Sequence, residues 1–267
     1  MGNLTKRKFA CIKSFVLFVG YPRSGHSLIA ALLDAHPEIV ISMEWGVLSH
    51  LRMGYGRNQI HYSIERHERL FTRKLNNIWT GYSYKVQGMW QGQYKTIRVI
   101  GDKLAGQTSL ILRTDPVLLE RLQLAMGCPV KIIHVVRNPY DTITTMAKRS
   151  FEKSGLKGEL NTDFLAPFID KYFDRAAVVQ KLKDAGEFDI LDLHHEDMIK
   201  DSGSILTRLL NFLEVKIPEN YITMCSESIY NEPHKSRLEF DWPDDLKIKV
   251  RENLEKYSFM EHYRFED

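Results

Sequence analysis

The stretch at residues 15–37 constrains the fold more than any other part of the chain. Residues 15–19 form a short continuous apolar run, which is typical of a buried parallel strand. A turn with two glycines follows at residues 20–27, and apolar residues then recur at helical spacing until Pro37. A strand, a glycine-containing loop and a helix in this order direct free backbone N–H groups at an anion. The sequence therefore predicts an α/β protein whose first loop binds an anion.

The loop has the Gly-xxxx-Gly-x-Ser spacing of a Walker A phosphate loop, except that His26 stands in the place of the lysine. Arg23, inside the loop, supplies a fixed positive charge instead. A nucleotide kinase or hydrolase also needs Mg²⁺ and a carboxylate at the end of a strand, a role that Asp102 could fill. A P-loop kinase or hydrolase therefore stays open as an alternative. So does a degenerate nucleotide-binding protein that keeps the fold without catalysis, because His26 departs from the motif.

Strands and helices alternate through most of the chain. Further strand-like apolar runs lie at residues 38–42, 96–100, 131–136 and 189–193. Helical patterns lie at residues 63–77, 108–126, 139–149, 161–182, 202–213 and 243–256, with a break at Asp115 and Pro116. A loop is expected at residues 151–160. This alternation predicts one α/β domain over residues 1–267, with three layers: a parallel sheet and helices on both of its faces.

The composition argues against several classes of protein. The formal net charge of +3 is too small to indicate a nucleic-acid-binding surface. The three cysteines are far apart in the sequence, so they indicate neither a disulfide framework nor a metal cluster. Residues 1–13 form a basic tail without the long apolar segment of a membrane span, which favours a cytoplasmic protein. A Golgi protein is an alternative only if an N-terminal anchor is missing from this chain.

Polar side chains follow the expected strands and the first loop. Open parallel sheets bind ligands beyond the carboxyl ends of their strands, so these side chains are expected at one edge of the sheet. They are the side chains of residues 23–27, Glu44, Lys103, Arg137 and His195. A nucleotide with phosphates at two places would use two of these corners for its anions.

The chain resembles the sulfotransferases that use 3′-phosphoadenosine 5′-phosphosulfate (PAPS), from about residue 15 to the C-terminus. The likeness is weakest over residues 48–90. Residues 21–27 resemble the 5′-phosphosulfate loop of that family. Arg23 matches a position that the family fills with Lys or Arg, and His26 departs from the threonine that usually follows the glycine. The resemblance implies a P-loop NTPase-like sulfotransferase fold.

Later segments resemble the parts of the family that bind the rest of the nucleotide. Residues 131–150 resemble the 3′-phosphate segment, with Arg137 and Thr145 at its Arg and Ser positions. His195 begins a segment similar to Tyr-Glu-Asp-Leu, and residues 235–237 resemble a basic loop that closes on the 3′-phosphate. The resemblance implies PAPS binding by Arg23, Ser24, Gly25, His26, Ser27, Arg137, Thr145, His195, Lys235, Ser236 and Arg237.

The catalytic residues also follow from the resemblance. Residues 33–37, followed by Glu44, resemble the protein-tyrosine and several bacterial sulfotransferases, in which the matching glutamate is the proposed base. Cytosolic enzymes place a histidine after the third strand-like run, whereas Asp102 and Lys103 stand there in this chain. The resemblance therefore implies Glu44 as the base, with Arg23 and Lys103 stabilising the charge on the group being transferred.

The implied activity is transfer of a sulfuryl group from PAPS to a hydroxyl or amine of an acceptor. No metal is expected, and neither is a nucleic-acid partner. The segment at residues 48–95 is interpreted as an insertion that covers the sheet edge and lines the acceptor pocket. With no anchor in the sequence, a small-molecule acceptor is the leading hypothesis. The sequence names neither the acceptor nor the oligomeric state.

Overall fold

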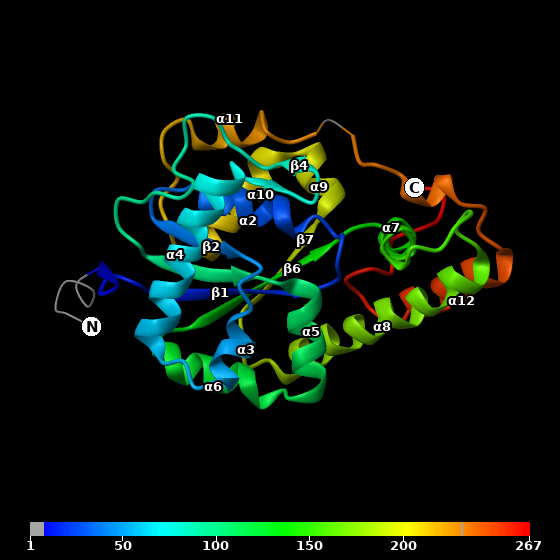
Figure 1. Cartoon of the computed structure of the whole chain (residues 1–267), viewed down its shortest axis with the longest axis horizontal. Helices are drawn as coiled ribbons and strands as arrows, with labels where there is room; N and C mark the ends of the chain where they lie inside the picture. Colours follow the sequence, from blue (N-terminus) through cyan, green and yellow to red (C-terminus); the bar gives the residue numbers. More distant parts are fainter. Residues whose placement is uncertain (1–7, 231) are drawn as a thin grey trace.

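A five-stranded parallel sheet forms the centre of the molecule, in the order β2-β5-β1-β6-β7 (Figure 1). The computed structural model describes residues 8–230 and 232–267, so residues 1–7 of the expected basic tail lie outside the described residues. The strands of the sheet are β1 (Ser14–Gly20), β2 (Ile39–Met43), β5 (Val99–Lys103), β6 (Val130–Val136) and β7 (Ile190–His194). A separate antiparallel hairpin joins β3 (Ile78–Trp79) to β4 (Tyr82–Ser83).

Helices separate most of the strands. They are α2 (His26–Asp34), α3 (Val47–Arg52), α4 (Arg57–Leu75), α5 (Ala105–Thr114), α6 (Val117–Met126), α7 (Pro139–Ser154), α8 (Thr162–Ala185), α9 (His195–Lys200), α10 (Ser202–Phe212), α11 (Tyr221–Ser226), the 3₁₀ helix η1 (Ser236–Glu239) and α12 (Asp244–Leu254). Asp115 and Pro116 separate α5 from α6, as the sequence predicts, because proline cannot continue a helical hydrogen-bond ladder.

Alternate residues of β1 face two different hydrophobic cores. Phe15, Leu17 and Val19 are buried in one core, with side chains of α5, α6 and α8. Val16 and Phe18 are buried in the other core, with side chains of α2, α10 and α11. Successive side chains of a strand point to opposite faces of a sheet, so helices cover both faces (Figure 1). The three-layer α/β fold predicted from the sequence is confirmed.

The strand expected at residues 96–100 is displaced along the chain. β5 runs from Val99 to Lys103, and its pairing with β2 continues to Lys103. Gly101 therefore lies inside the strand rather than after it. A Cβ on Gly101 would lie 2.4 Å from the backbone oxygen of Val16 in β1, so the glycine permits close approach of the two strands.

Three smaller features also differ from the sequence prediction. α7 continues to Ser154, so helix occupies the first part of the loop expected at residues 151–160. The segment at residues 48–95 contains most of α3, the long helix α4 and the small β3–β4 hairpin. The short helix α11 has no clear signal in the sequence, because one and a half turns are too few to establish a helical period.

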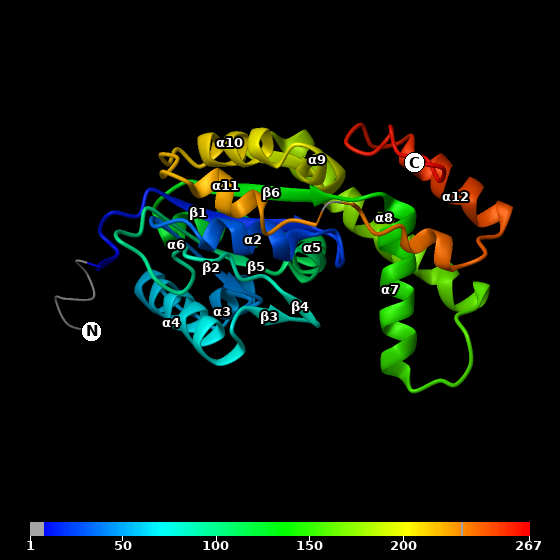
Figure 2. The same cartoon turned by 90° about the horizontal axis from the view of Figure 1, so that it is seen from above.

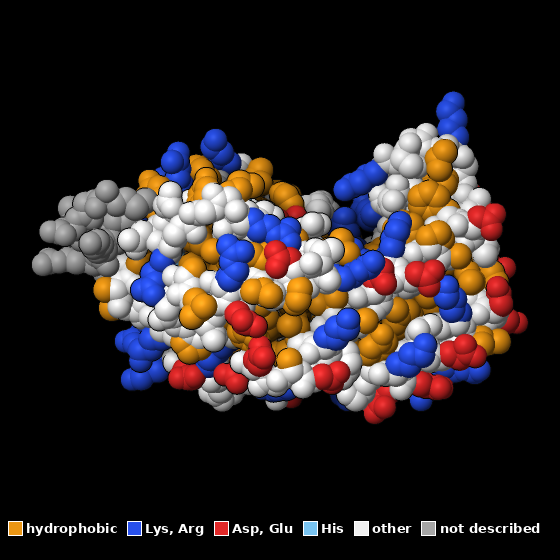
Figure 3. Space-filling model, turned by 90° about the horizontal axis from the view of Figure 1, so that it is seen from below, with side chains coloured by type: hydrophobic (Ala, Val, Ile, Leu, Met, Phe, Trp, Pro, Cys, Tyr) orange, Lys and Arg blue, Asp and Glu red, His pale blue; other side chains and the backbone are white. Residues whose placement is uncertain are grey.

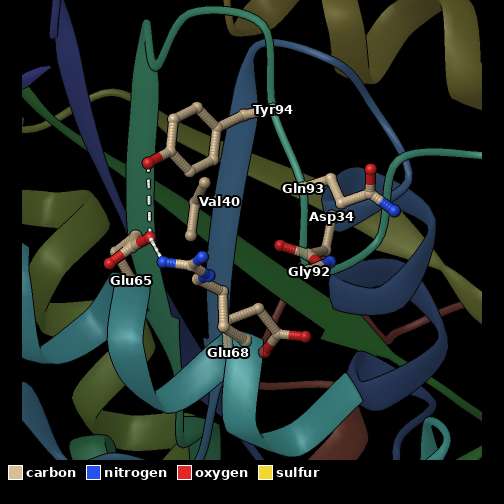
Figure 4. A pocket seen from close by; sticks show the side chains of 8 residues that line it. Asp34, Val40, Glu65, Glu68, Gly92, Gln93 and Tyr94 are labelled. Atoms are coloured by element: carbon tan, nitrogen blue, oxygen red, sulfur yellow. Dashed lines mark hydrogen bonds and ion pairs between the residues drawn. The ribbon is translucent and has the colours of Figure 1, made fainter. Parts of the chain in front are cut away.

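Two buried carboxyl groups connect α2 to α4, which packs along the edge strand β2. Asp34 and Glu68 line the same small pocket between these helices (Figure 4), and the charge of Asp34 acts on Glu68. The Asp34 carboxylate also accepts the backbone N–H groups of Ile41, at 3.0 Å, and Gly92, at 3.1 Å. Burial raises the pKa of Asp34 to about 7. Burial and the neighbouring Asp34 charge raise the pKa of Glu68 well above its usual value, so the pair retains a proton at neutral pH.

α7, α8 and α12 form an arm beyond the carboxyl ends of the strands (Figure 2). A space-filling view from the opposite side shows a hollow between this arm and the main body, with Lys and Arg side chains on its walls (Figure 3). No helix within residues 8–230 and 232–267 is both long and apolar enough to cross a membrane.

Candidate active site

The loop at residues 20–27 joins the carboxyl end of β1 to the first turn of α2. Gly25 caps α2 with a left-handed backbone, φ 94°, and no side chain caps the helix, so its first N–H groups are available to a ligand. Arg23 also has a left-handed backbone, φ 68°. Such a backbone in a non-glycine residue stores strain of the kind found at ligand-binding loops. The loop thus has the geometry of an anion site.

The substituted residue His26 turns into the loop rather than out of it. Its ring is buried, and Nδ1 lies 3.3 Å from the hydroxyl of Ser24, which itself donates to the backbone oxygen of Tyr21 at 3.1 Å. Burial lowers the pKa of His26 well below its usual value, and the charges of Lys103 and Arg23 lower it further. His26 is therefore neutral at pH 7, and the positive charges near the loop come from Arg23 and Lys103.

Lys103, at the end of β5, connects the first loop to Glu44, which follows β2. Its side chain is fully buried, and Nζ donates to Ser27 Oγ at 3.0 Å and to Glu44 Oε1 at 2.9 Å. Burial lowers the pKa of Lys103, and the Glu44 charge opposes that change. Glu44 lies just after β2 with a left-handed backbone, φ 60°, and its side chain is 33% exposed. Three residues from three corners of the sheet thus form one hydrogen-bonded group.

Asp102 has a different role from the one considered from the sequence. Its carboxylate accepts the Ser42 hydroxyl at 2.7 Å and the backbone N–H groups of Trp45, Gly46 and Val47 at 2.9–3.0 Å. Both carboxylate oxygens are therefore engaged in holding the turn that carries Glu44. A carboxylate with four such donors is poorly placed to bind Mg²⁺, which weakens the kinase or hydrolase alternative. Within residues 8–230 and 232–267 no cluster of three or more His, Cys, Asp or Glu residues could hold a metal ion.

A second cluster of polar side chains forms where α7 meets η1. Thr145 Oγ1 lies 2.9 Å from the hydroxyl of Ser236, and the Arg137 guanidinium donates to the backbone oxygen of His234. The Arg137 Nε atom is buried and has no hydrogen-bond partner among the described residues. An unpaired buried N–H is costly, so this corner is suited to an added acceptor such as a phosphate oxygen.

Arg237 is engaged more fully than Arg137. Its guanidinium donates to Asp141 Oδ2 at 2.6 Å and to the backbone oxygens of Phe265 and Asp267. Lys235 is exposed, and its ammonium also donates to the backbone oxygen of Asp267. These two predicted ligands of a 3′-phosphate are thus occupied by Asp141 and residues 265–267, and a phosphate would compete with those contacts.

His195 lies between the two corners. A Cβ added to Gly25 would lie 2.3 Å from the His195 ring, so only a glycine allows the loop to approach the ring this closely. The pKa of His195 is lowered to about 4 by burial first and then by the charge of Arg137. A neutral flat ring therefore separates the first loop from Arg137, in a place suited to one end of a nucleotide base.

The sequence interpretation assigns no role to three further residues of the site. Asp141 holds both Arg237 and, at 4.0 Å, Arg137. Tyr84, in the loop after β4, lies beside Ser27 and Arg23: burial raises its pKa, and both neighbours oppose that rise. Glu196 accepts the backbone N–H of Asn138 at 2.8 Å. Asp141 follows Arg137 by four residues, and this spacing is a local signal of an ion pair, whereas Tyr84 has no comparable signal.

The model of the sulfotransferase family matches residues 16–219, which is more than half of the chain. The chain belongs to the sulfotransferase family. This match confirms the family that the resemblance implies. A search of curated proteins finds no match.

Comparison with solved structures also returns sulfotransferases. The sulfotransferase domain of the olefin synthase of Synechococcus PCC 7002 is 18% identical, with a TM-score of 0.50, and the alignment covers 88% of this chain and 82% of that one. The sulfotransferase domain from the curacin biosynthetic pathway is 16% identical, with a TM-score of 0.49 and coverage of 79% and 76%. Mouse sulfotransferase SULT7A1, solved in complex with PAP, is 18% identical, with a TM-score of 0.47 and coverage of 87% and 69%.

Proposed function

We propose that this sulfotransferase moves a sulfuryl group from PAPS to a hydroxyl or amine of an acceptor. The observation that carries the proposal is the contact of Lys103 with both Ser27 and Glu44, at 3.0 and 2.9 Å. Ser27 belongs to the loop that would hold the leaving phosphate, and Glu44 carries a carboxylate that can accept a proton. The cation between them is positioned to act on charge that develops during the transfer.

The residues at both corners fit the cosubstrate. The N–H groups of the first loop and the charge of Arg23 would hold the 5′-phosphosulfate. Arg137, Thr145 and Ser236 would hold the 3′-phosphate, since Arg137 keeps a buried Nε donor that pairs with no other described residue. His195 would lie against the adenine. When bound, PAPS supplies a sulfuryl group, and the transfer forms one S–O or S–N bond while the bond to the phosphate oxygen breaks.

The chain's own residues would supply acid–base and electrostatic assistance. Glu44 would take the proton of the attacking hydroxyl or amine, acting as a general base. Lys103 and Arg23 would stabilise the negative charge that gathers on the leaving phosphate. The Glu44 side chain is 33% exposed, so an acceptor can reach its carboxylate.

The insertion at residues 48–95 is the proposed wall of the acceptor pocket. Trp45, which directly follows Glu44 in the chain, stacks on His50 with ring centroids 3.8 Å apart. His50 in turn contacts Tyr55 edge-on. On the other side, Tyr84 reaches Ser27 and Arg23. Aromatic walls beside a carboxylate suit a small acceptor with an apolar body and one reactive hydroxyl or amine.

The nucleotide preference tests this proposal directly. Isothermal titration in EDTA with 3′-phosphoadenosine 5′-phosphate (PAP) is expected to give micromolar or tighter binding, with ATP binding much weaker. PAPS turnover with a panel of small alcohols, phenols and amines is expected to continue in EDTA, because no metal takes part. No PAP binding in EDTA, together with ATP binding that Mg²⁺ restores, would instead support the kinase or hydrolase alternative. PAP binding without transfer to any acceptor would support a degenerate nucleotide-binding protein.

A further inference from the structure

A chain of buried polar groups runs beneath the first loop, outside the site described above. His134 in β6 is fully buried; its Nδ1 lies 2.8 Å from Asp192 Oδ1, and its Nε2 lies 3.3 Å from the Tyr21 hydroxyl. Asp192 is the register partner of His134 in β7 and also accepts from Lys183 of α8. Pairing of β6 with β7 thus fixes His134 beside Asp192, and the other end of this series of hydrogen bonds is Tyr21 of the first loop.

The protonation state of this group follows from its surroundings. Burial tends to raise the pKa of Asp192, but its contacts with His134 and Lys183 outweigh burial and lower the pKa to about 2, so the group is a carboxylate. Burial lowers the pKa of His134, and Asp192 opposes that change. At neutral pH the imidazole is therefore neutral and donates Nδ1–H to Asp192. Its Nε2 then has a free lone pair, which accepts the Tyr21 hydroxyl.

The imidazole contacts the first two residues of the loop. Gly20 has φ 115°, and a Cβ there would lie 2.9 Å from His134 Cδ2. The Tyr21 ring stacks on Tyr172 of α8 with centroids 4.0 Å apart and planes 13° apart. The backbone oxygen of Tyr21 accepts the Ser24 hydroxyl at 3.1 Å, so the orientation of Tyr21 is passed on to the middle of the loop.

We infer that His134 is a positioning residue for the first loop: by holding the Tyr21 hydroxyl it orients the backbone N–H groups of residues 20–27. Asp192 fixes the tautomer that makes this possible, because a carboxylate partner keeps the proton on Nδ1. The part of the inference that concerns the nucleotide rests on the proposed function. The part that concerns loop order does not, because it can be measured without a ligand.

Two substitutions of His134 separate the two hydrogen bonds of its imidazole, one to Asp192 and one to Tyr21. An asparagine amide reaches about as far as Nδ1, so His134→Asn can still donate to Asp192 but loses Tyr21. A glutamine amide reaches about as far as Nε2, so His134→Gln can accept the Tyr21 hydroxyl through its oxygen but loses Asp192. Both variants remove a buried ring, so both are expected to lower the melting temperature. Tyr21→Phe removes only the hydroxyl and keeps the stacked ring. It tests the same hydrogen bond if either histidine variant fails to fold.

The first measurement is hydrogen–deuterium exchange of the loop amides in the ligand-free protein. His134→Asn and Tyr21→Phe are each expected to speed exchange in residues 20–27 by about tenfold, and the double variant is expected to add little. His134→Gln is expected to stay within about twofold of the wild type. The matched control is His36→Asn, since His36 is also buried and makes two hydrogen bonds, to Lys216 O and Glu38 N, at the far end of α2.

The outcomes are decisive in both directions. Unchanged loop exchange in His134→Asn or Tyr21→Phe would overturn the inference. Equally fast exchange in His134→Gln would also overturn it, because loss of packing rather than loss of the Tyr21 contact would then be the cause. PAP titration of the same proteins adds the nucleotide: His134→Asn is expected to bind PAP about five- to tenfold more weakly, and His134→Gln close to normally. If the wild type binds no PAP while the exchange pattern holds, the proposed function fails and the positioning role stands.

Discussion

At the scale of single residues, the site depends on charges held out of water. Lys103 is fully buried, and its ammonium has Glu44 as its ion-pair partner at 2.9 Å. Removing one partner of a buried ion pair lowers the free energy of unfolding by about 3–5 kcal/mol, because the other charge is left buried without a partner. Substitutions at Glu44 must therefore keep a hydrogen-bond acceptor if they are to report on catalysis rather than on folding.

The first prediction concerns Glu44 as the base. Glu44→Gln keeps an oxygen that can accept from Lys103 but cannot take a proton, so we expect turnover to fall by about 10²-fold or more while PAP affinity changes little. Steady-state kinetics with PAPS and titration with PAP give the two values. Glu38→Gln is the matched control, since Glu38 lies at the other end of β2 and pairs with the exposed Arg98. Full turnover in Glu44→Gln would exclude Glu44 as the base.

The second prediction concerns Arg137 and the 3′-phosphate. The Arg137→Ala substitution removes charged donors, and hydrogen bonds to charged groups contribute about 1.5–3 kcal/mol. We expect PAP to bind about ten- to a hundredfold more weakly, with little change in turnover at saturating PAPS. Titration calorimetry provides the affinity, and Arg149→Ala serves as the control, since Arg149 lies in α7, the helix that follows Arg137, and pairs with the exposed Glu152. An unchanged PAP affinity would remove Arg137 from the nucleotide site.

At the scale of elements, the Asp34–Glu68 pair links α2, which begins at the first loop, to the insertion helix α4. Both groups have raised pKa values in the folded protein, so the folded state binds more protons than the unfolded state. The contribution of the pair to stability is therefore fully present below about pH 4 and is lost as pH rises through the folded pKa of about 7. The contact between α2 and α4 therefore stabilises the fold less at high pH than at low pH.

The third prediction tests this linkage. In Glu68→Gln one titrating group is gone and the amide can still donate to Asp34. We expect the decline in unfolding free energy between pH 5 and pH 8 to become shallower, by about 1.4 kcal/mol for each pH unit over which only the folded state holds the Glu68 proton. Urea unfolding at several pH values measures it. Glu65→Gln is the control, because Glu65 lines the same pocket on α4 and is ion-paired with Lys8 and Arg69. The same pH slope in Glu68→Gln and in the wild type would contradict the linkage.

The order of strands and helices was largely predictable from the sequence, because apolar runs and turn residues are local signals. The corners that carry Arg23, Glu44, Arg137 and His195 were predictable for the same reason, since each follows a strand. The role of Asp102 was not, because its backbone partners lie in the turn after β2, more than fifty residues away. Local sequence patterns contain no information about such a pairing.

The extent of β5 shows a further limit of local reasoning. Gly101 looks like a turn residue in isolation, yet it lies in the middle of the sheet because β1 approaches it closely. His134 illustrates the same point for polar residues. In the sequence it is one residue of a buried strand, and only the register with β7 brings Asp192 beside it. Contacts between strands, rather than patterns within them, decide these roles.

At the scale of the whole molecule, the candidate site brings together the beginning and the end of the described chain. The first loop belongs to the main body, whereas Arg137 lies at the base of the arm and contacts the backbone of His234. The hollow between body and arm is lined with Lys and Arg side chains (Figure 3). A nucleotide with phosphates at both ends would bridge the two parts and neutralise positive charge on both sides.

The last prediction follows from this bridging. A ligand that binds only the folded protein stabilises it by about 2.7 kcal/mol when present at a hundred times its Kd. We expect PAP at that ratio, in EDTA, to raise the unfolding free energy by this amount and to slow amide exchange at both residues 20–27 and residues 234–237. Adenosine 5′-phosphate is the matched control, because it lacks the 3′-phosphate and leaves the Arg137 corner without its ligand. It is expected to protect the first loop alone, and more weakly. Protection by PAP of only one of the two segments would mean that the corners do not share one nucleotide, and that body and arm bind separate anions.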